Sequence, residues 1–311
     1  MRKIVYKLVF LIILIFGLTY LVSDKERLLT LKNISAVNLS CLFFLCYLTM
    51  LLSGWQFRYL SMVFDIRLTF TEWFGLTVVN SMYNYFAPAR GGMVARAIYL
   101  KKKYKFPFSE FAALTTGVYW FGFLICSALA LILGIISYDP GNRTSMIIVA
   151  SSATLLLVIV VLGVVVLYVD TPKLPLPSAR FRTIYTTFYC GLCRFRENTT
   201  FLLLICLFCF GFVFLSAAAL YWAFVSVGIR VSFLSVLLVQ AFLSVSLVVS
   251  ITPGNLGIRE GIIGVFAGIL GISIEQALLG AFVDRAISII VVFFFGSIYS
   301  KILLRNMSEI D

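Results

Sequence analysis

The sequence predicts an all-α polytopic membrane protein with about six full spans, two re-entrant helical hairpins and an inverted-repeat, transporter-like architecture. Of its 311 residues, 62% are hydrophobic, only 12% are charged and none is histidine. A soluble domain carries about 25% charged residues, so this chain cannot cover a water-facing surface. The composition therefore excludes a water-soluble enzyme and a secreted disulfide scaffold. The absence of histidine also removes the commonest general base and metal ligand.

Six apolar segments are long enough to cross roughly 30 Å of hydrocarbon. The first, residues 4–22, follows Arg2 and Lys3. It is predicted to be a retained span, not a cleaved signal peptide, because a charged stretch at residues 24–27 stands where a small-residue cleavage site would be needed. The other five lie at about residues 34–57, 108–137, 145–169, 200–227 and 277–304. We therefore predict a single integral membrane domain over residues 1–311.

Two further apolar segments are interrupted by polar residues, proline and glycine. Residues 73–99 contain Asn80, Asn84, Pro88, Arg90, Gly91, Gly92 and Arg96. Residues 234–271 contain Pro253, Gly254, Asn255, Gly257, Arg259 and Glu260. Proline and glycine interrupt backbone hydrogen bonding, and groups freed at membrane depth must be buried in protein or face water. Both segments are therefore predicted to be re-entrant hairpins with the breaks at their tips; an interfacial loop is the alternative for each.

The two interrupted segments match each other when the chain is shifted by 165 residues. The aligned pairs are Pro88 and Pro253, Gly92 and Gly257, Glu110 and Glu275, Ala112 and Ala277, and Leu114 and Leu279. In each copy the glutamate lies 22 residues after the proline and opens a long apolar helix. Three predicted spans, residues 108–137, 145–169 and 200–227, separate the two interrupted segments, so the second segment would enter the membrane from the opposite face. This pattern predicts an inverted repeat, with copies at about residues 72–137 and 234–304.

The basic residues predict the orientation of the chain. The formal net charge is +12. With the N-terminus inside, 16 of the 25 Lys and Arg residues fall in predicted cytoplasmic positions and five in outer loops. This bias predicts an inner or plasma membrane protein with both termini cytoplasmic. The cluster at residues 101–105 acts as an anchor that also attracts anionic headgroups. No basic run lies on a hydrophilic domain, so nucleic acid is not an expected partner.

Four basic residues fall outside the loops, in the breaks or in the last span: Arg90, Arg96, Arg259 and Arg285. An arginine at the bilayer centre costs about 2.5–3.5 kcal/mol, so these side chains need partners or a wet cavity. Guanidinium groups suit phosphate oxygens, and helix N-termini after the two prolines would add amide donors. The breaks therefore predict an anion site. Glu260 and Asp284 either bind the ligand or have a structural role, in which Glu260 pairs with Arg259 or Arg285 and locks the hairpin.

The sequence thus offers two sets of candidate residues. The substrate-binding set is Arg90, Arg96, Arg259, Glu260, Arg285, Asp284, Asn84 and Asn255. The hinge set is Pro88, Gly91, Gly92, Pro253, Gly254 and Gly257. We expect no catalytic residue, cofactor or metal. The one metal-like pattern, two CxxC pairs at residues 190–193 and 206–209, would be held roughly 20 Å apart by a continuous helix, too far for one zinc ion.

Two motifs at the breaks resemble those of a known family. Residues 88–97, Pro-Ala-Arg-Gly-Gly-Met-Val-Ala-Arg-Ala, and residues 253–261, Pro-Gly-Asn-Leu-Gly-Ile-Arg-Glu-Gly, resemble the signature motifs of the flippase-like family. This family comprises the membrane region of lysylphosphatidylglycerol synthases and stand-alone proteins. Residues 277–285 resemble its last motif, and the resemblance extends from about residue 36 to 300.

The resemblance implies translocation of a polar-headed lipid, with Arg90, Arg96, Arg259, Glu260 and Arg285 at the matched polar positions. This chain departs from the pattern twice: Met93 stands where the family usually has glutamate, and Asp284 where it usually has tyrosine. No soluble aminoacyltransferase domain follows the last span, so we expect the synthase activity to be absent.

We therefore predict a lipid flippase that moves a phospholipid or an aminoacylated phospholipid between leaflets. The tails stay in the bilayer while the headgroup passes between the hairpin tips. No nucleotide-binding loop is present, so we expect facilitated transport or coupling to the membrane potential, which supplies about 2.3 kcal/mol per charge per 100 mV. Membrane lipids are the expected partners, and we do not expect an enzyme.

Two alternatives stay open. One is a transporter of polyprenyl-phosphate-linked sugars for envelope glycan synthesis. The other is a membrane partner, without transport activity, of a glycosyltransferase or lipid synthase; an oligomer is compatible with either. An intramembrane lipid-modifying enzyme is disfavoured, because the sequence offers no histidine, metal-ligand cluster or nucleophile–base pair.

Overall fold

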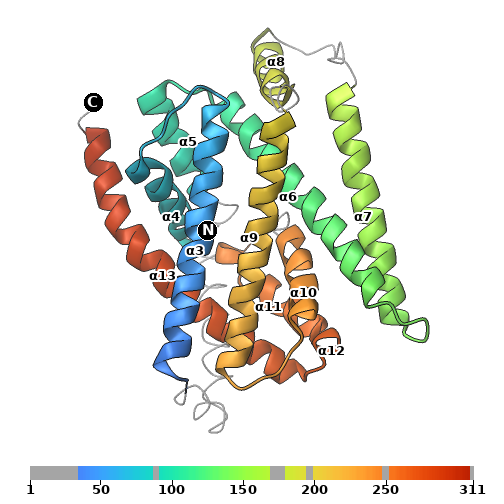
Figure 1. Ribbon diagram of the computed structural model, residues 1–311. Coiled ribbons are helices and arrows are strands. Elements are labelled where there is room, and N and C mark those ends of the chain that lie inside the picture. The colour runs from blue at the N-terminus through green and yellow to red at the C-terminus, as the bar shows by residue number, and fades with distance from the viewer. Residues whose placement is uncertain (1–33, 87–90, 169–178, 194–198, 247–251, 309–311) are drawn as a thin grey trace, which may run out of the picture.

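The structure is a computed structural model that describes residues 34–86, 91–168, 179–193, 199–246 and 252–308. Within these ranges every regular element is a helix (Figure 1). The elements are α3 (Ala36–Met62), α4 (Phe70–Phe86), α5 (Gly91–Tyr104), α6 (Phe108–Ile136), α7 (Arg143–Tyr168), α8 (Ala179–Cys193), α9 (Thr199–Ser226), α10 (Phe233–Ser246), η3 (Pro253–Asn255), α11 (Ile258–Val265), α12 (Ala267–Leu270) and α13 (Ile274–Ser308). The all-helical fold class is confirmed for the described residues.

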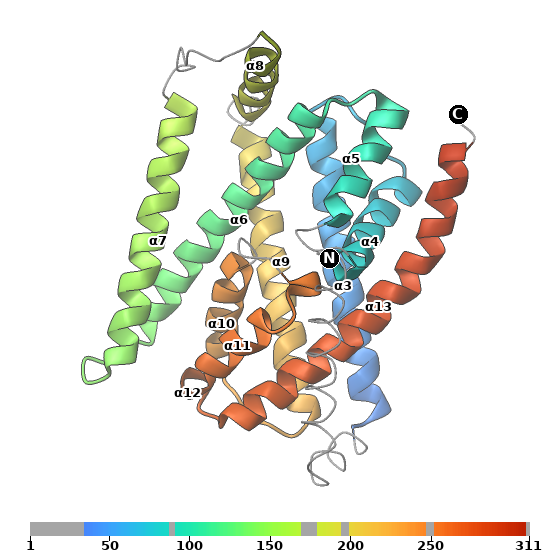
Figure 2. The ribbon, with the colours of Figure 1, turned by 180° about the vertical axis from the view of Figure 1, so that it is seen from behind.

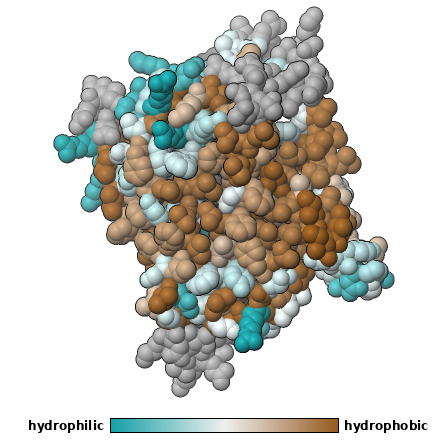
Figure 3. Space-filling view, viewed as in Figure 1, coloured by the Kyte–Doolittle hydropathy of each residue, from teal (hydrophilic) through white to brown (hydrophobic). Residues whose placement is uncertain are grey.

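Five of the described helices are long and apolar enough to cross a membrane: α3, α6, α7, α9 and α13. They coincide, within a few residues, with the last five apolar segments predicted from the sequence. The first predicted span, residues 4–22, lies outside the described residues. A broad apolar band covers the middle of the molecule, and polar residues gather at its two ends (Figure 3). The chain is therefore a multi-pass membrane protein.

Two helices differ from the sequence prediction. Helix α13 has 35 residues and begins before the apolar run, because Ser273 and Gln276 cap it reciprocally. The Gln276 amide nitrogen donates to Ser273 Oγ at 3.3 Å, and the Ser273 amide nitrogen donates to Gln276 Oε1 at 3.1 Å. Helix α8, to which the sequence analysis assigned no element, is a 15-residue helix that lies at one end of the bundle and contacts α6.

The helices form one bundle in which the two interrupted segments occupy opposite halves. Helices α4 and α5 lie in the half where α3 and α13 end, and α10 to α12 lie in the half where α3 and α13 begin (Figures 1 and 2). Helix α6 follows the first interrupted segment and α13 follows the second, and these two helices run in opposite directions through the bundle. Helix α7 is peripheral and packs on α6.

Helices α4 and α5 pack against each other in an antiparallel arrangement. Near the break, the Gly92 amide nitrogen donates to Asn84 Oδ1 at 3.1 Å. A Cβ added at Gly92 would overlap the backbone carbonyl of Asn80, so glycine allows the helices to approach this closely. At the far end, Glu72 of α4 accepts hydrogen bonds from Tyr99 and Tyr104 of α5.

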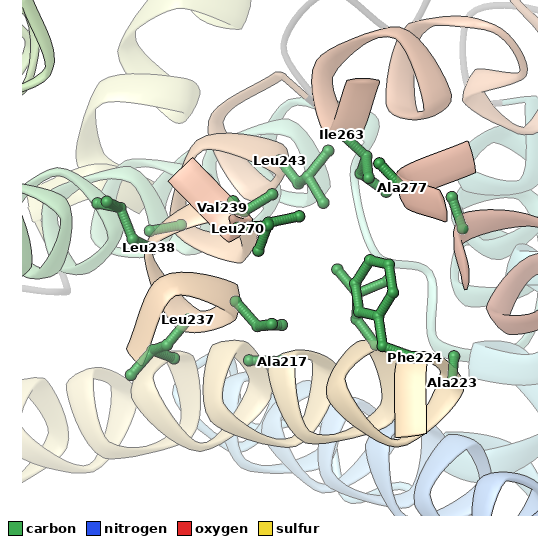
Figure 4. Packing of buried hydrophobic residues seen from close by; sticks show 14 of the residues in the cluster. Ala217, Ala223, Phe224, Leu237, Leu238, Val239, Leu243, Ile263, Leu270 and Ala277 are labelled. Carbon is green, nitrogen blue, oxygen red and sulfur yellow. The ribbon is translucent and has the colours of Figure 1, made fainter. Parts of the chain in front are cut away.

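Two clusters of buried side chains pack the two halves. One joins α10, α11, α12 and α13 to α9, where Phe224 lies against the side of α13 and small residues such as Ala217 and Ala277 let the helices approach (Figure 4). The other joins α3, α4, α5, α6 and α9 and is rich in aromatic side chains such as Trp73 and Phe74. Each interrupted segment is thus held in the bundle by its own core.

Candidate functional site

A cavity of about 200 Å³ lies inside the bundle beside Arg96. Six helices, α3, α4, α5, α6, α9 and α10, contribute to its wall. Its polar lining residues are Ser53, Gln56, Thr77, Asn80, Ser81, Arg96, Thr115, Tyr119 and Ser244. Aromatic and aliphatic side chains complete the wall, among them Phe57, Met93 and Phe111.

Arg96 lacks a carboxylate partner within the described part of the chain. Its Nη2 donates to Thr77 Oγ1 at 3.2 Å and to the Leu76 carbonyl oxygen at 3.5 Å, and its Cζ lies 4.0 Å from the centroid of the Phe57 ring. Its Nε is buried without a hydrogen-bond acceptor among the described residues. Among the described residues, the groups in contact with the guanidinium are thus neutral, which leaves its charge available to an anion.

A second cavity, of about 270 Å³, lies beside the other interrupted segment. Its charged lining residues are Arg259, Asp284 and Arg285. Its other polar lining residues are Thr49, Ser53, Thr77, Ser81, Ser216, Gln240, Ser244, Asn255 and Ser288. Unlike the first cavity, it holds carboxylate and guanidinium groups together.

Each arginine of the second cavity is paired with a carboxylate. Arg259 Nη2 lies 2.6 Å from Asp284 Oδ2, and Arg285 Nη2 lies 3.0 Å from Glu260 Oε1. Arg285 also donates to the carbonyl oxygen of Gly254 at 2.7 Å and to that of Asn255 at 3.3 Å. Of the two pairings considered for Glu260, the structure has the one with Arg285. The charges on this side therefore cancel in pairs.

The backbone of the second break has positive φ angles, which glycine and asparagine adopt more readily than other residues. Gly254 has φ of 60°, Asn255 has φ of 58° and Gly257 has φ of 83°. The Gly257 amide nitrogen donates to Glu260 Oε2 at 2.7 Å, which caps α11. A Cβ added at Gly254 would overlap the ring of Tyr85, so the end of α4 touches the second break. Tyr85 Oη also accepts a 3.4 Å hydrogen bond from Arg285.

The two cavities adjoin. Five residues line both: Ser53, Thr77, Ser81, Phe212 and Ser244. On α3 the first cavity is lined by residues 53–60 and the second by residues 46–53. This offset of about seven residues corresponds to roughly 10 Å along the helix axis. The cavities are therefore stacked along the bundle, with the Arg96 cavity nearer the end where α3, α5 and α13 finish.

The structure distributes the predicted residues over different places. Arg90 and Pro88 lie outside the described residues. Arg96 lies at the first cavity, whereas Asn255, Arg259, Asp284 and Arg285 line the second. Asn84, Gly91 and Gly92 join α4 to α5, and Pro253, Gly254, Gly257 and Glu260 form the second break. Whether they bind substrate stays a prediction.

Most of the uncharged part of the cavity walls was not predicted from the sequence: Asn255 was a candidate residue, and Asn80 was recognised only as an interruption of its segment. Gln240 is the one amide side chain in the otherwise apolar helix α10, and Asn80 is a single amide in the apolar part of α4. A polar residue within an apolar helix is the signal that could have found them. The hydroxyl groups at Thr77, Ser81 and Ser244 carry no such signal, because serine and threonine are common in membrane helices.

A comparison with protein families gives one match. A family model described as the transmembrane region of lysylphosphatidylglycerol synthase matches residues 4–296. The matched range contains both interrupted segments and both cavities. A search among curated proteins finds no match for this chain.

Proposed function

The chain belongs to the family of the lysylphosphatidylglycerol synthase transmembrane region, and on this basis we propose that it is a flippase that moves a lipid with a polar or anionic headgroup between the membrane leaflets. The headgroup passes through the two adjoining cavities while the acyl tails remain in the bilayer. The protein acts as a carrier and not as an enzyme, and membrane lipids are its partners.

The observation that carries the proposal is the guanidinium of Arg96, which lies at an interior cavity and has no carboxylate partner in the described part of the chain. A charge at this depth is expensive unless it has a partner or a wet surrounding, so its position favours a functional role. The phosphate group of a membrane lipid is an anion that can enter a membrane-embedded site laterally from the bilayer. The structure supports this role because Arg96 Nε has no acceptor among the described residues.

The route beyond Arg96 is polar enough to carry a headgroup. The hydroxyl groups of Ser53, Thr77, Ser81 and Ser244 line both cavities and replace hydrogen bonds that the headgroup makes with water outside the membrane. The arginine–carboxylate pairs of the second cavity add charge without a net excess, so they do not trap a phosphate group after it leaves Arg96.

In this proposal the two interrupted segments are re-entrant hairpins related as an inverted repeat. Three features support it: each segment folds as short helices around a break, the segments occupy opposite halves of the bundle, and α6 and α13 after them run in opposite directions. Glu110 and Glu275, which the repeat aligns, both lie in the first turn of their helices.

Transport in vesicles tests the proposal. The purified protein is reconstituted with a lipid whose acyl chain bears a fluorophore, and the loss of fluorescence to an impermeant quencher reports translocation. Wild-type protein should move the lipid faster than protein-free vesicles do. Arg96→Gln should slow this at least about tenfold, because a hydrogen bond to a charged group is worth about 1.5–3 kcal/mol.

Arg143→Gln is the matched control, because it removes the same charge from an exposed position at the start of α7, away from both cavities. It should transport as the wild-type protein does. Equal rates for wild type and Arg96→Gln would contradict the role of Arg96. A wild-type protein that moves no lipid would contradict the flippase proposal itself.

A further inference from the structure

Three of the four hydroxyl groups shared by the two cavities offer acceptors, and not donors, to a bound molecule. Thr77, Ser81 and Ser244 each donate their hydroxyl hydrogen to the backbone carbonyl four residues earlier, at 2.8, 3.0 and 2.9 Å. A hydroxyl group has one hydrogen, so each of these three has used its donor and retains only acceptor lone pairs. The same holds for Thr115 in the first cavity and Thr49 in the second.

Amide oxygens extend this set of acceptors. Gln240 and Asn255 line the second cavity, and their side chains are only 7% and 9% exposed. Gln240 Oε1 and Asn255 Oδ1 receive no hydrogen bond from the described residues. Asn80 Oδ1, in the wall of the first cavity, is also without a donor in that part of the chain. Buried acceptors of this kind are costly unless a bound group supplies the hydrogens.

Among the charged donors of the two cavities, Arg96 differs from the other two arginines. Arg259 and Arg285 are engaged by carboxylates and, for Arg285, by two backbone carbonyl groups. Arg96 is the cation that lacks a carboxylate within the described residues. A ligand that pairs these groups therefore needs one anionic acceptor for Arg96 and hydrogen-bond donors for the unpaired amide oxygens of the wall.

From this polarity we infer that the transported lipid is a phosphodiester whose headgroup carries hydrogen-bond donors, either hydroxyl groups or a primary ammonium group. The phosphate lies at Arg96, and the donor-bearing end of the headgroup reaches Gln240 and Asn255 in the second cavity. Glycerol and ethanolamine headgroups meet this requirement, whereas choline does not, because its quaternary ammonium has no N–H. The inference rests on the proposed flippase function and names the substrate class of the same site.

A methylation series tests the inference at constant headgroup charge. The probes are acyl-labelled phosphatidylethanolamine, its N,N-dimethyl derivative and phosphatidylcholine, whose ammonium groups carry three, one and no N–H donors. Acyl-labelled phosphatidylglycerol separates hydroxyl from ammonium donors. We expect transport rates to fall along the series, with phosphatidylcholine at least about tenfold slower than phosphatidylethanolamine, because it leaves the wall acceptors unpaired.

Equal rates for phosphatidylethanolamine and phosphatidylcholine would overturn the inference and leave the flippase proposal standing. Transport of none of these lipids would overturn both. If phosphatidylglycerol moves and phosphatidylethanolamine does not, the inference holds for hydroxyl donors alone; the reverse result restricts it to ammonium donors.

Two variants tie the selectivity to the wall. Gln240→Met removes an acceptor at nearly constant size, and Ser244→Ala removes one at the junction of the cavities. Each should reduce the ratio of the phosphatidylethanolamine rate to the phosphatidylcholine rate several-fold. Ser127→Ala is the matched control for Ser244→Ala, because Ser127 is also a buried helical serine that donates to a backbone carbonyl, but it lines neither cavity. An unchanged ratio in Ser244→Ala would contradict the inference, even if Gln240→Met fails to fold.

Discussion

Glu72 anchors the interrupted segment α4–α5 through one buried carboxylate. It is 1% exposed, and Lys103 Nζ lies 2.8 Å from its Oε1. It also accepts hydrogen bonds from the Thr69 backbone and hydroxyl groups at 2.9 and 2.8 Å, from Tyr99 at 3.0 Å and from Tyr104 at 2.9 Å. Burial acts to raise the pKa of Glu72, but the hydrogen bonds from Lys103, Thr69 and Tyr104 outweigh it and lower the pKa from 4.5 to about 2.

This pKa shift predicts acid sensitivity. A carboxyl group whose pKa is lower in the folded protein contributes stability above its unfolded pKa and loses it as the pH falls. The contribution of Glu72 is therefore complete above about pH 5 and lost progressively between pH 4.5 and about 2. Thermal unfolding of the detergent-solubilised protein should show a smaller loss of Tm with acid for Glu72→Gln than for wild type. Parallel pH profiles would contradict this role.

The pair of Arg259 and Asp284 predicts an asymmetric response to mutation. The Asp284 side chain is 3% exposed, whereas that of Arg259 is 22% exposed and can reach the cavity. Arg259→Gln leaves a buried carboxylate without its partner and should destabilise the protein by about 3 kcal/mol. Asp284→Asn should destabilise the protein less than Arg259→Gln does. The double variant, which carries both substitutions, should be more stable than Arg259→Gln alone. Thermal unfolding of the three variants measures the coupling, and additive effects would show that the pair contributes no stability.

At the scale of elements, the close packing of α4 on α5 depends on Gly92. An added methyl group there overlaps a backbone carbonyl that cannot rotate away, so Gly92→Ala should destabilise the protein by about 1–3 kcal/mol. Gly261→Ala in α11 is the control, because nothing lies within 4 Å of its added Cβ. A lower Tm for Gly92→Ala with an unchanged Tm for Gly261→Ala is the expected result. Equal Tm values would mean that the helices separate at no cost.

The elements themselves were largely predictable from the sequence. Apolar runs set the spans, and their ends agree with α3, α6, α7, α9 and α13 because charged residues or turns follow each run. Proline and glycine marked both interruptions, because these residues interrupt the backbone hydrogen bonding of a helix. Helix α8 was not predicted because it is short and contains Arg180 and Arg182, so mean hydropathy does not reveal it. Helical periodicity was the available signal.

Contacts between elements were not predictable in the same way. The tyrosine partners of Glu72 on α5 lie 27 and 32 residues from it in the sequence, and Tyr85 and Arg285 are 200 residues apart. No local pattern specifies which carboxylate meets which arginine, since this depends on how the helices pack. The sequence placed the charges at the two breaks and in the last span, but the division of the interior into an Arg96 cavity and a charge-paired cavity depends on how α3, α9 and α10 pack.

At the scale of the whole molecule, the basic residues are sorted to one end. Helices α3, α5 and α13 finish there, and their last turns or adjoining residues carry Arg58, Lys101, Lys103, Lys301 and Arg305. The positive-inside rule then predicts that this end is cytoplasmic. The Arg96 cavity lies on that side of the charge-paired cavity, so in the proposed transport the phosphate of a lipid from the cytoplasmic leaflet would meet Arg96 first.

Transport by the purified wild-type protein alone tests the central claim most directly. Vesicles containing the protein and an acyl-labelled phosphatidylethanolamine or phosphatidylglycerol are treated with an impermeant quencher. If the protein moves the labelled lipid between leaflets, probe from the inner leaflet also becomes accessible to the quencher. The fraction of fluorescence protected from the quencher should then fall well below that of protein-free vesicles. A protected fraction equal to that of protein-free vesicles, for both lipids and with folded protein present, would contradict it.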